Sequence, residues 1–128
     1  MVKKMLSERI LVVERERIVA MDIDHILRGS GYSHTTLAYS YDEAMGMISS
    51  SRPDLVLIDE LISDDSDGSD AGRKIMESFK IPVLYLASSS PSTGKRQEGD
   101  RLSHFLHKPF RADEVSASVK KILSRKNK

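Results

Sequence analysis

Short apolar runs alternate with amphipathic stretches along most of the chain. The strongest runs, 10–13 and 55–58, are apolar on both faces, which is typical of central strands in a parallel sheet covered by helices. Weaker runs of the same kind follow at intervals. The predicted strands are 10–13, 34–39, 55–58, 81–86 and 105–107.

Apolar residues recur near helical spacing after each of the first three predicted strands and after the last. Gly29 and Gly31 are expected to end the first helix, and Ser40 with Glu43 forms the pattern of a capping box that opens the second. The apolar positions are Ile18, Val19, Met21, Ile23, Ile26 and Leu27, then Ala44, Met45, Met47 and Ile48, then Ala71, Ile75, Met76 and Phe79, and finally Val115, Val119, Ile122 and Leu123.

The order of these elements is βαβαβαβαβα if the polar stretch before the last strand holds one further helix. Such alternation predicts a parallel sheet with helices on both faces, because each right-handed crossover lays its helix on the sheet. The chain shows neither an internal repeat nor a linker. We therefore expect one α/β domain over residues 1–128.

The composition narrows the class of protein without changing this interpretation. The chain has 128 residues, of which 39% are hydrophobic and 30% charged, so it can build a core and keep a well-solvated surface. Its net charge of +1 and its lack of cysteine favour neither nucleic-acid binding nor a disulfide framework. With no apolar stretch of membrane-spanning length, we expect a cytoplasmic protein.

Three predicted strands end in ionisable residues. These are Glu14, Arg15 and Glu16 after the first strand, Asp59 after the third and Lys108 after the fifth. The carboxyl ends of strands in an open α/β sheet form its binding cleft. A carboxylate facing a lysine there could accept a phosphoryl group, with the charge held by Lys108 and a divalent metal. The simpler alternative is that Asp59 only caps the next turn.

Over nearly its whole length the sequence resembles the receiver domain of response regulators in two-component signalling. Five stretches in the family's order carry the resemblance, and together they are specific although each is weak alone. They are Ile10–Glu14, Pro53–Asp59, Asp67-Gly68, Ile81–Leu86 and Lys108–Phe110. The resemblance implies a flavodoxin-like (βα)5 three-layer sandwich with a five-stranded parallel sheet in the order 2-1-3-4-5.

The resemblance also implies roles for particular residues. Asp59 would be the phosphoacceptor, with a sensor histidine kinase or phosphotransfer protein as donor, and Lys108 would contact the phosphoryl group. Glu14, Asp59 and the backbone carbonyl of Leu61 would help bind Mg²⁺. Phe105 would be the switch aromatic on the fifth strand, and the position that usually carries Thr or Ser at the end of the fourth strand is Ala87.

The metal site departs from the family pattern at Arg15, which stands where a second acid is usual. Three carboxylates and one lysine would give a formal charge of −2, whereas Glu14, Arg15, Asp59 and Lys108 give 0. Two unit charges about 4 Å apart interact by roughly 4 kcal/mol at an effective dielectric constant near 20, so a cation here should weaken Mg²⁺ binding or abolish it. Our hypothesis is that Arg15 pairs with Asp59 and partly replaces the metal; the alternative is that Glu16 restores a ligand through an altered chain path.

The region that couples the site to the surface also departs from the pattern. Ala87 lacks the usual hydroxyl, and Ser88 could supply one only after a register shift that would turn it to the other face. Residues 91–104 contain one large apolar residue, Leu102, so a helix there should be short or mobile. The output surface that receivers form with this helix is therefore uncertain in this chain.

Other kinds of site have less support. The acidic loop 63–68 lacks the bidentate Glu that a calcium loop needs, since that position is Lys74, and the four histidines show no metal-ligand spacing. The basic tail lacks interleaved aromatic residues, so nucleic-acid binding is not expected. No nucleophile–base pair supports a hydrolase. Two functions stay open: a phosphoryl-accepting receiver with impaired metal binding, and a pseudo-receiver that binds proteins without phosphorylation.

Overall fold

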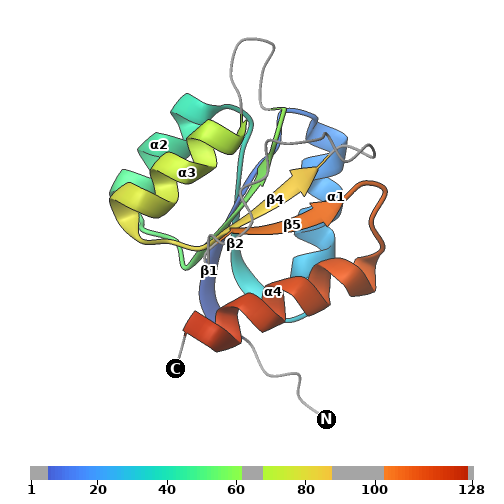
Figure 1. Cartoon of the computed structure of the whole chain (residues 1–128). Coiled ribbons are helices and arrows are strands. Elements are labelled where there is room, and N and C mark those ends of the chain that lie inside the picture. Colours follow the sequence, from blue (N-terminus) through green and yellow to red (C-terminus); the bar gives the residue numbers. More distant parts are fainter. Residues whose placement is uncertain (1–5, 62–67, 88–102, 127–128) are drawn as a thin grey trace.

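The computed structural model describes residues 6–61, 68–87 and 103–126 of the chain (Figure 1). Its strands and helices alternate as the sequence predicts, except that the segment between β4 and β5, where a further helix is expected, lies outside the described residues. They are β1 (Leu6–Val13), α1 (Arg17–Gly29), β2 (Tyr32–Ala38), α2 (Tyr41–Ser50), β3 (Leu55–Asp59), α3 (Gly68–Phe79), β4 (Val83–Ala87), β5 (Ser103–His107) and α4 (Ala112–Lys126).

The five strands form one parallel sheet in the order β2-β1-β3-β4-β5, which confirms the predicted fold class and strand order. The register pairs Val13 with Ile58 and Ala87 with His107. Because β1, β3 and β5 run in the same direction, the residues that follow them meet at one edge of the sheet. We call this the carboxyl edge, and the opposite one the amino edge.

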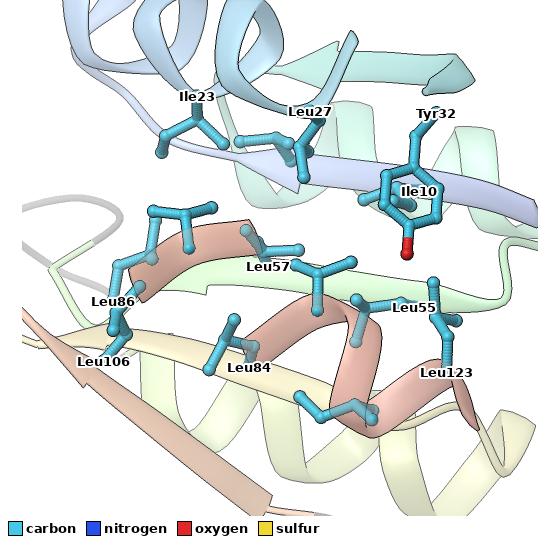
Figure 2. Packing of buried hydrophobic residues seen from close by; sticks show 14 residues of the cluster. Ile10, Ile23, Leu27, Tyr32, Leu55, Leu57, Leu84, Leu86, Leu106 and Leu123 are labelled. Atoms are coloured by element: carbon cyan, nitrogen blue, oxygen red, sulfur yellow. The ribbon is translucent and has the colours of Figure 1, made fainter. Parts of the chain in front are cut away.

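Alternate residues of the central strands fill two separate hydrophobic clusters. In β1, Ile10 and Val12 join the cluster under α1 and α4, whereas Leu11 and Val13 join the cluster under α2 and α3. Figure 1 shows these two helix pairs on opposite sides of the sheet, and Figure 2 shows the first cluster closing between α1, the sheet and α4. The period of two along a strand thus explains why these runs are apolar on both faces.

The predicted capping box at the start of α2 is confirmed. Ser40 is the N-cap, and its Oγ accepts a hydrogen bond from Glu43 N at 3.1 Å. The Glu43 carboxylate in turn accepts from Tyr39 N at 2.7 Å, one residue before the cap. Both bonds satisfy backbone N–H groups that have no partner within the helix. They also fix the chain direction between β2 and α2.

Several of the predicted strand boundaries are wrong, since β1 already begins at Leu6 and β2 spans Tyr32–Ala38 instead of 34–39. The prediction for β4 began at Ile81, but Ile81 and Pro82 precede the strand, which begins at Val83 and continues to Ala87. Proline lacks the N–H that an interior strand position donates, which explains the later start. Ser103 and His104 belong to β5 and not to the polar segment before it, since both pair with β4. The rest of the expected fourth helix, 91–102, lies outside the described residues.

Arg28 of α1 covers the free edge of β2. Ala38 O accepts from Glu14 N of β1, so by alternation the carbonyls of Ser33 and Thr35 face away from the sheet. The Arg28 guanidinium donates to both, at 3.2 and 3.0 Å, and its Nε is held by Asp24 at 2.9 Å. These bonds satisfy outward carbonyls that an edge strand otherwise presents to other chains.

Within the described ranges, no helix combines the length and apolar character needed to cross a membrane.

Candidate functional site

Three ionisable side chains meet at the carboxyl edge. Glu14 directly follows β1, Asp59 ends β3, and Lys108 directly follows β5. Lys108 Nζ donates to Glu14 Oε1 at 3.0 Å and to Asp59 Oδ2 at 2.8 Å. The backbone N–H of Lys108 donates to Ala87 O at 2.9 Å, which anchors the residue beside the end of β4. The convergence that the sequence predicts for Glu14, Asp59 and Lys108 is thus present.

Backbone donors complete the hydrogen bonding of both carboxylates. Leu61 N donates to Asp59 Oδ1 at 2.8 Å, and Glu16 N donates to Glu14 Oε2 at 3.0 Å. Each carboxylate oxygen of the pair therefore accepts at least one hydrogen bond from the protein. This pairing stabilises two carboxylates that are almost fully buried, with exposed fractions of 0% for Glu14 and 5% for Asp59.

The three groups shift one another's ionisation in different directions. Burial raises the pKa of Glu14, and hydrogen bonding with Asp59 raises it further. Burial opposes ionisation of Asp59 as well, but hydrogen bonds with Glu14, Lys108 and Leu61 N outweigh it and lower the pKa of Asp59. Burial likewise opposes the charge of Lys108, yet its bonds to both carboxylates raise its pKa. Asp59 is therefore an anion at neutral pH, as a nucleophilic carboxylate must be.

The remaining predicted site residues lie around this triad. Ala87 is fully buried at the end of β4, and Phe105 is half-buried, with its ring stacked on that of Tyr85 at 5.1 Å between centroids. Leu61 contacts Asp59 through its N–H, while its side chain is exposed. Ser88, the possible replacement for Ala87, lies outside the described residues.

Arg15 is exposed and follows the buried Glu14. Lys108 forms an ion pair with Asp59. The hypotheses that Arg15 pairs with Asp59, or that Glu16 restores a metal ligand, stay predictions. The backbone N–H of Glu16 donates a hydrogen bond to the Glu14 carboxylate, and this bond holds the turn after β1 against the site.

The residues at this site offer a magnesium ion few oxygen atoms that are not already hydrogen-bonded. Mg²⁺ requires near-octahedral oxygen ligands. Here the two carboxylates already accept from Lys108 and from backbone N–H groups, and the residue after Glu14 is a cation. Among the residues that the structure describes, no group of three His, Cys, Asp or Glu could hold a metal. Weak or absent Mg²⁺ binding therefore stays a prediction with a chemical reason.

The sequence analysis did not identify one tight contact behind the site. Gly72 of α3 lies against Tyr85 of β4, and a Cβ placed on Gly72 would collide with the ring and hydroxyl of Tyr85. Tyr85 is thereby held between Gly72 and the ring of Phe105. A glycine inside a predicted helix, where it costs stability, was the signal that could have revealed it.

Comparisons with known proteins agree with this geometry. Residues 10–120 match the family model described as "Response regulator receiver domain". The phyllosphere-induced regulator PhyR of Methylorubrum extorquens is 31% identical over 121 residues, which cover 92% of this chain and 44% of that protein. The response regulator MprA of Mycobacterium bovis is 32% identical over 123 residues, which cover 94% and 52%. The chain spans about half the length of these curated relatives.

Solved structures show the same likeness. PhyR from Brucella abortus superposes with a TM-score of 0.81 at 29% identity, covering 97% of this chain and 51% of that one. The "anti-anti-sigma factor PhyR" from Bartonella quintana gives a TM-score of 0.80 at 29% identity, covering 95% and 49%. The isolated receiver domain of Erythrobacter litoralis PhyR gives 0.79 at 27% identity, covering 92% and 91%.

Proposed function

The chain belongs to the family of response regulator receiver domains, and on this basis we propose that Asp59 accepts a phosphoryl group from a histidine kinase or phosphotransfer protein. The observation that carries the proposal is the 2.8 Å contact between Lys108 Nζ and Asp59 Oδ2. It joins a cation to a buried carboxylate whose pKa is lowered, so that a nucleophile and a stabilising charge lie side by side.

The chemistry is an in-line displacement at phosphorus. An oxygen of Asp59 donates an electron pair to the phosphorus of a phosphohistidine, the P–N bond breaks, and its electron pair leaves on the imidazole nitrogen. The product is an acyl phosphate on Asp59 and a free histidine on the donor. Lys108 then neutralises charge on the phosphoryl oxygens in place of charge on the carboxylate. In this account the chain is a phosphoacceptor and not an enzyme that turns over a substrate.

A second function, a pseudo-receiver that binds protein partners without phosphorylation, is favoured by two observations. Ala87 offers no hydroxyl at the end of β4, and Arg15 adds a cation beside the site. Without phosphorylation, the ion pairs of Lys108 would serve only to hold the three strand ends together. The name of one similar structure, an anti-anti-sigma factor, is consistent with a partner of the anti-sigma class.

Intact mass spectrometry after incubation with acetyl phosphate, with and without Mg²⁺, separates the two functions. The donor is a small molecule, so no partner kinase is needed. The proposal expects the added mass of one phosphoryl group on the wild type and on Asp70→Asn, which changes an exposed carboxylate of α3, but not on Asp59→Asn. An unmodified wild type under both conditions would favour the pseudo-receiver.

We further propose that residues 1–128 form one receiver domain that works in the cytoplasm, without membrane or nucleic-acid contacts of its own. Because the curated relatives are about twice as long, their whole activities are not assigned to this chain.

A further inference from the structure

A groove of about 410 Å³ opens near the amino edge of the sheet, away from Asp59. It lies between β2 and the end of α2, beside the middle of β1 and Pro53, which precedes β3. The groove exists because α2 ends at Ser50 and leaves His34 and Thr36 of β2 exposed. Its volume falls within the range of small-molecule sites.

Two basic side chains face each other across the neighbouring strands at this groove. Arg9 of β1 and His34 of β2 are partners in the strand register, and both line the groove. Arg9 Nη1 donates to Ser51 Oγ at 2.8 Å, which directs the guanidinium toward the end of α2. Because Ser51 Oγ accepts this bond, its own hydrogen is left to donate to a ligand. Arg9 carries a fixed positive charge, and the imidazole ring of His34 can add an N–H donor beside it, so the pair can bind an anion from two strands.

The negative groups near the groove are already engaged. None of the described residues that line it is acidic, and the nearby Asp54 accepts from Arg9 N at 2.8 Å. The last carbonyls of α2 also have donors, since Ser50 Oγ binds Gly46 O at 3.0 Å and Ser51 N binds Met47 O at 2.9 Å. The negative end of the helix is thereby partly compensated, and the lining stays basic.

The groove also has apolar walls. Met47 and Pro53 line it together with the hydroxyl-bearing residues Thr36 and Ser51. Sites of this kind, apolar with a few converging donors, orient a ligand through its polar end. An inorganic ion alone would use only part of this surface.

We propose that the groove binds a small organic anion, with its carboxylate or phosphate group between Arg9 and His34 and its apolar part against Met47 and Pro53. The site does not depend on phosphorylation of Asp59. Its charge, shape and position are independent of the triad at the other edge.

The test is a titration of the ¹⁵N-labelled full chain followed by NMR, with sodium benzoate and sodium phosphate as probes and sodium chloride at equal ionic strength as reference. We expect saturable shifts at the amides of Arg9, His34, Thr36 and Ser51 with benzoate and with phosphate. Arg9→Gln should weaken both by about tenfold or more, because it removes a charge-assisted donor. Arg125→Gln, at an exposed position on α4, is the matched control and should change neither.

Two further variants separate a loss of binding from a loss of folding and test the apolar wall of the groove. His34→Gln removes an exposed side chain, so it should weaken binding without affecting folding, even if Arg9→Gln disturbs β1. Met47→Ala should weaken benzoate more than phosphate. Shifts that stay linear and match those with chloride would overturn the proposal, as would saturable binding that Arg9→Gln and His34→Gln leave unchanged.

Discussion

The charged side chains are buried and paired at the carboxyl edge of the sheet, whereas those at the amino edge are exposed to solvent. At the carboxyl edge, Glu14 and Asp59 are buried, and Lys108 and backbone N–H groups engage every carboxylate oxygen. At the amino edge, Arg9 and His34 are exposed in an open groove without an acidic lining residue. The difference shows that burial makes a charged group dependent on its partners, whereas exposure leaves it available to a ligand.

The largest expected effect comes from breaking the buried triad. Lys108→Met leaves two buried carboxylates without their cation, and it should lower the free energy of unfolding by about 3 kcal/mol at neutral pH. Urea unfolding measures the loss. Lys120→Met, at an exposed position of α4, is the control and should change stability little. Equal stability of Lys108→Met and the wild type would show that the triad is not energetically coupled.

Two helical glycines, Gly72 in α3 and Gly46 in α2 near the groove, allow the packing around them to be compared. In Gly72→Ala the new Cβ would collide with Tyr85, so we expect a loss of about 1–2 kcal/mol. Gly46→Ala is the matched variant, since a Cβ there meets nothing within 4 Å in the part of α2 near the groove. It should stabilise the protein by up to about 1 kcal/mol through helix propensity. Thermal unfolding compares the two, and a stabilised Gly72→Ala would contradict the close contact with Tyr85.

The raised pKa of Glu14 predicts a pH dependence with a definite sign. The folded state disfavours ionised Glu14, so the stability that the protonated group contributes is present at low pH and is lost as pH rises above the ordinary value of 4.5 toward the raised pKa. The stability of Glu14→Gln relative to the wild type should therefore increase with pH through this window. Urea unfolding from pH 4 to 7 measures it.

Asp59 gives the opposite sign. Its pKa is lowered, so its contribution is present above the ordinary value of 3.8 and is lost as pH falls toward the lowered pKa. Asp59→Asn should thus differ most from the wild type near neutral pH. Parallel pH profiles for Glu14→Gln and Asp59→Asn would contradict the division of roles between the two carboxylates.

The smallest expected effect concerns the metal. Arg15→Asp replaces a cation by a possible oxygen ligand, so its melting temperature should rise with MgCl₂ more than that of the wild type. Arg15→Gln removes the charge without adding a ligand and should lie between them. Thermal unfolding at constant ionic strength provides the measurement. Identical responses to Mg²⁺ in all three proteins would refute our account of Arg15.

The sequence is sufficient to predict the triad of Glu14, Asp59 and Lys108, because the strand topology alone brings these three residues together. Once β1, β3 and β5 are parallel strands, the residues that follow them must share one edge, and Glu14, Asp59 and Lys108 are charged in the printed sequence. The backbone donors Glu16 N and Leu61 N could not be predicted in the same way. Every residue but proline has an N–H, and only the turn geometry directs one to a carboxylate.

The amino-edge groove could not be predicted because it forms where α2 does not cover the neighbouring strands. Its existence depends on α2 ending at Ser50 and on Arg9 reaching Ser51, which lies 42 residues away in the chain. Periodicity locates a helix but does not say how much of the neighbouring strands it covers. The glycine inside the predicted α3 helix signals a close contact, but its partner Tyr85 could not be predicted, because it depends on how α3 and β4 are placed relative to each other.

Arg28 affects whether other protein chains can pair with the edge strand β2. Its two bonds to the outward carbonyls of β2 withhold acceptors that a foreign strand would need to extend the sheet there. At high protein concentration, such chains should therefore not extend the sheet by pairing along β2. The Arg28 guanidinium, held in place by Asp24, thus protects part of this edge strand against pairing with another chain.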